Sequence, residues 1–94
     1  MKIKSFSLGK LYGTPGALAQ LSPERITEIL SRFSTGDWGC SGRDDGHLND
    51  VATHEGTRIF AAYWIDEKDH DRGKVWCICE SDRSHTTLLL PDEY

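Results

Sequence analysis

Three apolar runs decide the fold of this chain: Arg58-Ile-Phe-Ala-Ala-Tyr-Trp-Ile65, Lys74-Val-Trp-Cys-Ile-Cys-Glu80 and Thr86-Thr-Leu-Leu-Leu90. They are rich in β-branched and aromatic residues, and short polar connectors separate them. This pattern predicts an antiparallel meander with strands over 58–65, 74–80 and 86–90. The first two strands are apolar on both sides, which is typical of strands covered on each face by a helix or by a partner.

A strong helix signal precedes the meander. Ser22 is placed to cap the helix, Pro23 takes its first position, and Glu24 faces the positive end of the helix dipole. Apolar residues then recur at i, i+3, i+4 and i+7 until Gly36 ends the pattern. The sequence therefore predicts a helix over about 23–34.

A second helix is predicted over about 43–55, after a glycine-rich loop and before Gly56, which stops it. Its apolar stripe is thin and consists of Leu48, Val51 and Ala52. We expect a surface helix with one narrow buried edge.

The segment 2–8 alternates imperfectly and favours a short N-terminal edge strand. Lysines at positions 2, 4 and 10 suit an edge, because charge there blocks pairing between molecules. The expected fold is α+β: an antiparallel sheet of three to four strands with the two helices on one face, in a single domain spanning 1–94.

Composition limits the function classes. The chain has 94 residues, 37% of them hydrophobic, and a formal net charge of −4. One modest core fits this length, and an acidic balance disfavours nonspecific binding to a nucleic-acid backbone. An odd number of cysteines, three, and the lack of a long apolar run indicate a cytoplasmic protein with reduced thiols, away from membranes.

Metal-ligating residue types are present at unsuitable spacings. His47, Asp50 and His54 share one helix side, but the two histidines are about 10.5 Å apart along the axis. Cys77 and Cys79 form a C-x-C pair on a strand, which differs from the C-x-x-C pairs of zinc sites, so they read as small core residues. The loop 66–73 has the composition of a calcium loop without its spacing. We expect no metal and no cofactor.

Catalysis is not expected either. Asp82, Ser84 and His85 contain the residue types of a serine triad, but they are almost adjacent in the chain. Triad members converge from separate segments, and a polar turn over 81–84 explains these residues better. We expect no enzymatic activity.

The candidate contact residues lie in loops. Asp37 and Trp38 stand between two glycines, so the tryptophan is either a lid over the core or an exposed anchor for a partner. Arg43 and Arg83 could join Trp38 if their loops lie at the same end. A further acidic group could contact a basic surface of a partner; it comprises Asp66, Glu67, Asp69 and Asp71.

Several blocks of this sequence resemble a family of short proteins carried by bacteriophages, plasmids and integrated elements, often labelled "plasmid-related protein" or type I restriction subunit. There are four blocks: Thr14-Pro-Gly-Ala-Leu18; Gly36-Asp-Trp-Gly39, with Asp44 and Asn49-Asp50 after it; Gly56, Arg58 and Ala62-Tyr63; and Asp82-Arg-Ser84 followed by Thr86-Thr87 and Leu89-Leu-Pro-Asp-Glu-Tyr94. The chain departs from the pattern at Cys77 and Cys79, where β-branched residues are expected. The resemblance implies a genetic context and no mechanism.

That context suggests a function. Small accessory proteins of mobile elements often disable host defences by docking onto a nuclease or a nucleic-acid-binding complex. We therefore expect an inhibitor of the anti-CRISPR or anti-restriction type, which binds a protein partner without contacting nucleic acid directly. The alternative is a homodimeric structural or regulatory subunit of a mobile element, with no catalytic activity.

Overall fold

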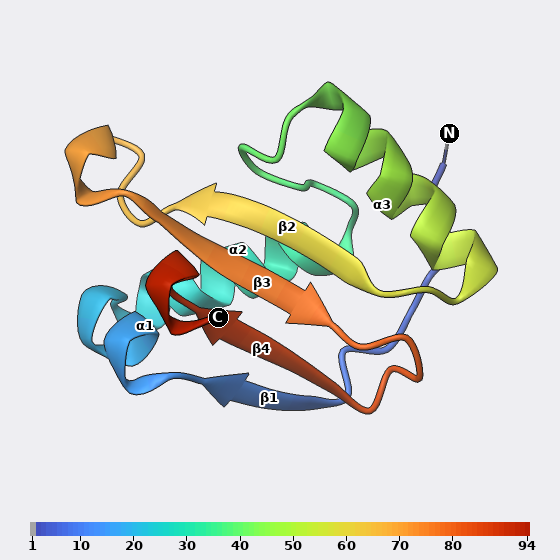
Figure 1. Ribbon diagram of the computed structural model, residues 1–94, viewed down its shortest axis with the longest axis horizontal. Helices are drawn as coiled ribbons and strands as arrows, with labels where there is room; N and C mark the ends of the chain where they lie inside the picture. Colours follow the sequence, from blue (N-terminus) through green and yellow to red (C-terminus); the bar gives the residue numbers. More distant parts are fainter. Residues whose placement is uncertain (1) are drawn as a thin grey trace.

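A computed structural model describes residues 2–94 and confirms the α+β class (Figure 1). Along the chain the elements are β1 (Lys10–Gly13), α1 (Pro15–Gln20), α2 (Pro23–Ser34), α3 (Arg43–Glu55), β2 (Ile59–Trp64), β3 (Lys74–Cys79) and β4 (His85–Leu89), with short 3-10 helices η1 (His70–Arg72) and η2 (Pro91–Glu93). Both predicted helices are confirmed. The short helix α1 is an addition to the expected elements.

The sheet has the strand order β1-β4-β3-β2 and is mixed. The predicted meander is confirmed, because β2, β3 and β4 pair antiparallel in chain order. The fourth strand differs from the expectation of an antiparallel edge: β1 pairs parallel with β4, with Leu11 opposite Thr86. Figure 1 shows β1 at one margin of the sheet and β2 at the other.

The predicted edge strand over 2–8 is wrong. This segment is extended but belongs to no strand, and Ile3, Phe6 and Leu8 pack against the core. Their spacing of three and two residues does not alternate, so a strand could not bury all three on one face. The chain enters β1 only after Gly9, where φ is +66° and a Cβ would lie 2.4 Å from the Ser84 carbonyl oxygen.

The main core lies between the sheet and α2. Ile29 and Phe33 of α2 are fully buried, and so are alternate residues of the central strands. The strand residues that share this face are Ile59, Ala61, Tyr63, Val75, Cys77 and Cys79. Cys77 and Cys79 are free thiols in this core, as predicted.

Helix α3 lies along the outer margin of β2, not over the face that α2 covers (Figure 1). The expected apolar stripe is wrong in part, because Leu48 is 63% exposed while Asn49, Ala52 and Thr53 are buried. Helix α3 is turned about its axis so that Asn49, and not Leu48, faces β2. Its side-chain amide donates to the Phe60 carbonyl oxygen at 2.9 Å and its oxygen accepts from the Phe60 N–H at 3.2 Å.

The rest of the outer edge of β2 is bonded in the same way. The Cys40 N–H donates to the Ala62 carbonyl oxygen at 2.8 Å, and the Ala62 N–H donates to Ser41 Oγ at 2.9 Å. This loop can approach because Gly39, at φ +65°, has no Cβ, which would lie 2.4 Å from the Ala62 oxygen. Arg25 of α2 donates to the Trp64 carbonyl oxygen at 2.6 Å. An edge so covered cannot pair with another chain.

We predict that Asn49→Ala destabilises the fold by roughly 1–3 kcal/mol, because it leaves the partly buried N–H and C=O of Phe60 without their side-chain partner. Urea unfolding followed by circular dichroism measures the change. The control is His47→Ala, an exposed position of the same helix. Equal stability of the two variants would show that the edge contact is dispensable.

Candidate functional site

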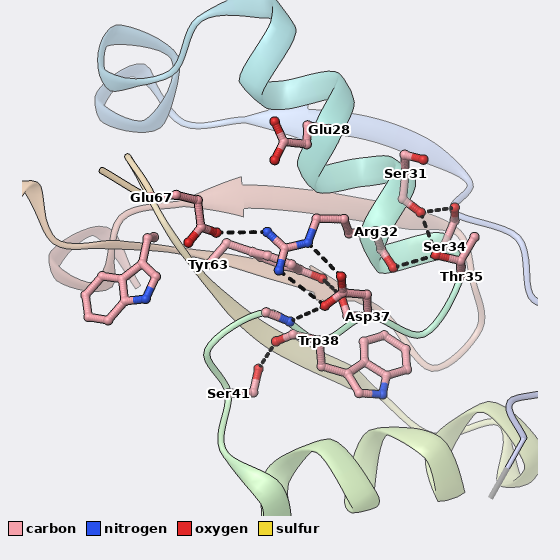
Figure 2. A network of polar contacts seen from close by, with 12 residues as sticks. Glu28, Ser31, Arg32, Ser34, Thr35, Asp37, Trp38, Ser41, Tyr63 and Glu67 are labelled. Atoms are coloured by element: carbon pink, nitrogen blue, oxygen red, sulfur yellow. Dashed lines mark hydrogen bonds and ion pairs between the residues drawn. The ribbon is translucent and has the colours of Figure 1, made fainter. Parts of the chain in front are cut away.

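The predicted contact residues Asp37 and Glu67 meet at Arg32 of α2 (Figure 2). The Arg32 guanidinium donates to both carboxylate oxygens of Asp37, at 2.9 and 3.3 Å, and to Glu67 at 3.0 Å. The Tyr63 hydroxyl donates to the Asp37 carbonyl oxygen at 2.7 Å. These contacts fasten the loop after α2 and the loop after β2 to one helix, so both acids have a structural task.

The ion pairs shift the titration of these groups. Hydrogen bonds from Arg32 lower the pKa of Asp37 and of Glu67, and the same bonds raise the pKa of Arg32. Glu67 also accepts from Arg25 at 3.1 Å. The two carboxylates are about half exposed, at 53% and 47%, so solvent screens the attraction.

Trp38 is a core lid, and the reading as an exposed anchor is wrong. The side chain is only 8% exposed. Its ring packs against Phe33 and Phe6, with centroids 5.5 and 6.4 Å away, and its indole N–H donates to Asp50 at 2.8 Å. The glycines around Trp38 let the loop fold back, and burial of so large a ring is what holds it there.

The Arg83 side chain is also engaged within the fold. It adopts φ +58°, and its guanidinium donates to the carbonyl oxygens of Ala52, Thr57 and Glu80 at 2.8–3.1 Å. It therefore joins the C-terminal end of α3 to the residue that follows β3. Arg43 is exposed at the other end of the helix, about 18 Å away along the axis. The two arginines do not meet, and a role for Arg43 stays a prediction.

The acidic loop between β2 and β3 is confirmed as a polar hairpin connection. Asp66 accepts from the Lys68 N–H and lies 3.7 Å from Arg72, while Asp69 caps η1 by accepting from the Asp71 N–H. Part of its charge is thus used inside the loop. Partner binding through these acids stays a prediction.

The surface that sequence reasoning missed is the sheet face opposite α2. Phe60, Trp76 and Tyr94 form a triangle of rings with centroids 4.8, 5.6 and 6.2 Å apart. Arg58 lies over Phe60 and Tyr94 and donates to the Tyr94 hydroxyl at 2.9 Å. We call these four residues the aromatic face. Tyr94 is 67% exposed, while Phe60 and Trp76 are half-buried.

Two grooves meet at the aromatic face. One, of about 380 Å³, runs between α3 and Arg58, and the other, of about 230 Å³, is lined by Cys40, Lys74 and Trp76. Both are lined by Asp45 and Phe60. In the sequence, the apolar second face of the strands indicated this surface. No sequence pattern indicated that Tyr94, which follows η2, would lie against it.

Within residues 2–94, no three His, Cys, Asp or Glu side chains are placed to hold a metal ion together. Cys40 lines the smaller groove, and burial raises its pKa, which keeps the thiol protonated and weakly reactive. Among the same residues, no helix is long and apolar enough to cross a bilayer.

Comparisons with protein-family models, with curated proteins and with solved structures find no match for this chain. The sheet face opposite α2 offers aromatic rings, an arginine and two grooves.

We predict that Trp38→Ala destabilises the fold by about 3–5 kcal/mol, because it empties a buried aromatic site. Trp38→Phe should cost about 1 kcal/mol, since it keeps the ring contacts and loses the bond to Asp50. Denaturant unfolding measures both. Tyr94→Ala, at an exposed ring, should stay within roughly 1 kcal/mol. A tryptophan that could be removed without loss of stability would contradict its place in the core.

The Arg32 contacts predict a dependence on pH. A carboxylate with a lowered pKa stabilises the fold above the ordinary carboxyl pKa of about 4, and this stability is lost as the pH falls through the lowered value. Asp37→Asn, which keeps the acceptor for the Gly39 N–H, should reduce stability at pH 7 by roughly 0.5–1 kcal/mol and have little effect near pH 2. Urea unfolding across this range tests the sign, with the exposed Glu55→Gln as control.

Proposed function

We propose that this protein is a small protein-binding module of a mobile genetic element, and that it inhibits a host defence complex of the restriction or CRISPR type. The observation that carries the proposal is the aromatic face. Tryptophan, tyrosine and arginine are the residue types that contribute most energy at protein interfaces. Here they are grouped beside two shallow grooves, on a sheet face that α2 leaves open.

The dimensions support binding to a protein. A standard interface buries about 800 Å² on each partner. The whole chain exposes 5534 Å², so one face can supply that area. Phe60 and Trp76 are held by the strands, and Tyr94 by its bond to Arg58, so little side-chain entropy would be lost on binding.

The charge around the aromatic face supports a protein partner over nucleic acid. Arg58 and Lys74 are accompanied by Asp45 and Glu80, and Arg58 lies 3.8 Å from Glu80. Binding to a phosphate backbone needs an excess of cations, whereas this surface is mixed and the chain as a whole carries −4. The choice of a defence complex rests on the resemblance to proteins of phages and plasmids.

The test is a plaque assay in host strains that each carry one restriction or CRISPR system. Expression of the protein should raise phage plaquing by at least about tenfold in one strain, and Arg58→Ala with Tyr94→Ala should remove most of this effect, since each hot spot contributes about 1–2 kcal/mol. Purified defence complex then measures binding of the same variants. Ser31→Ala, at an exposed position of α2 on the other side of the sheet, is the control.

The outcomes separate two parts of the proposal. No protection in any strain would contradict inhibition of host defence. Protection that survives the double substitution, with the fold intact by circular dichroism, would contradict the aromatic face as the binding surface.

A further inference from the structure

The two margins of the sheet are unlike. Side chains and a loop cover the outer edge of β2, whereas β1 is the last strand on its side and has no strand beyond it within residues 2–94. Three large apolar side chains lie exposed there: Leu11 at 54%, Tyr12 at 53% and Leu18 at 52%. An open edge with apolar side chains is a surface on which another strand can pair.

The bonding of β1 shows which backbone groups are free to pair. The Lys10 N–H donates to the Ser84 carbonyl oxygen and the Thr14 N–H to the Leu88 carbonyl oxygen, both at 3.0 Å. Residues of a strand alternate in direction, so positions 10, 12 and 14 bond to β4. The N–H and C=O groups of Leu11 and Gly13 therefore point outward.

An apolar recess adjoins this edge. It has a volume of about 150 Å³ and opens between β1 and α2. Its floor and walls include Gly13, Leu18, Ile26 and Leu30. Leu18 packs over Gly13, where a Cβ would lie 2.7 Å from Leu18 Cδ2, and Leu11 lines the recess from the same face of the strand.

We propose that two copies of this chain pair through β1, antiparallel about a two-fold axis at Tyr12. In this register Leu11 of each copy lies opposite Gly13 of the other, so all four outward groups of each strand edge enter inter-chain hydrogen bonds. The dimer has one continuous sheet of eight strands, twice the four of each chain. This inference does not depend on the proposed function.

The same register brings complementary side chains together on the face that carries α2. Leu11 of one copy stands across from Gly13 of the other, at a Cα separation of about 5.5 Å. It therefore projects into the recess beside Leu18 and Ile26 of that copy. The two-fold axis repeats the contact, so each copy supplies both the protruding side chain and the recess that receives it.

On the opposite face the register pairs charges. Lys10 of one copy lies across from Thr14 of the other. Thr14 donates its hydroxyl hydrogen to Glu93, whose carboxylate also accepts from the Gly16 N–H at 3.0 Å. The Glu93 carboxylate is thus fixed beside the position that the Lys10 ammonium approaches. A second copy is the occupant that the edge fits, because protruding side chain, recess, cation and anion all lie beside β1 of the same chain.

Light scattering during size-exclusion chromatography tests the dimer on the protein alone. We expect a dimer with a dissociation constant of about 1 µM. At a protein concentration of about 100 µM, the expected mass is therefore twice the 10.6 kDa of the chain. Leu11→Asp should give a monomer, because it places a carboxylate at the apolar recess. Leu48→Asp, an equally exposed leucine on α3, should remain a dimer. Lys10→Glu and Glu93→Gln should each weaken the dimer at least about threefold.

Cross-linking tests the register. Tyr12 lies opposite Tyr12 of the other copy as a non-hydrogen-bonded pair, with Cα atoms about 4.5 Å apart, which is within disulfide range. In a Cys40→Ser background, Tyr12→Cys should form a disulfide-linked dimer on mild oxidation, and Leu48→Cys should not. A wild-type monomer at the stated concentration would overturn the proposal and leave the edge to a strand of a different protein. A Leu11→Asp dimer, or equal cross-linking of the two cysteine variants, would overturn the β1 interface.

Discussion

The structure depends on how the backbone groups at the outer edge of β2 are satisfied. A sheet edge exposes N–H and C=O groups that must find water or a partner. At this edge the partners come from three elements: Asn49 of α3 bonds Phe60, the loop at Cys40 and Ser41 bonds Ala62, and Arg25 of α2 bonds Trp64. Each bond also positions the element that makes it. One strand edge thus sets where α3 and the glycine-rich loop lie.

Because these elements cover the outer edge of β2, only other surfaces of the sheet remain for binding. With α2 on one face and α3 at the margin of β2, the open surfaces are the aromatic face and the β1 edge. They serve different proposed partners. Pairing through β1 about an axis normal to the sheet would place two aromatic faces on the same side of one sheet. A target with two matching sites could then bind both, which raises its effective affinity.

The helices could be predicted from the sequence because their signals are local. Ser22 begins α2 by accepting from the Arg25 N–H, and Pro23 takes the first helical position. Gly56 ends α3 in a left-handed conformation, and its N–H donates to the Ala52 carbonyl oxygen. The candidate site could not be predicted to the same degree. Trp38 and Arg83 are residue types common at interfaces, and Asp37 stands beside Trp38, but the fold uses all three internally. The half-buried ring of Phe60 and the exposed ring of Tyr94 are 34 positions apart and meet only in the folded chain.

The sequence by itself determined the α+β class, the antiparallel meander and the bounds of the two main helices, because hydrophobic periodicity and caps act over a few residues. Tertiary structure alone decided that residues 2–8 pack as an extended segment, that β1 joins the sheet in parallel, and that α3 turns Asn49 inward and Leu48 outward. The physical reason is competition for partners. A local pattern shows which side chains are apolar. Which buried backbone groups still need a hydrogen bond, and which apolar surface is already covered, depends on how the whole chain is assembled.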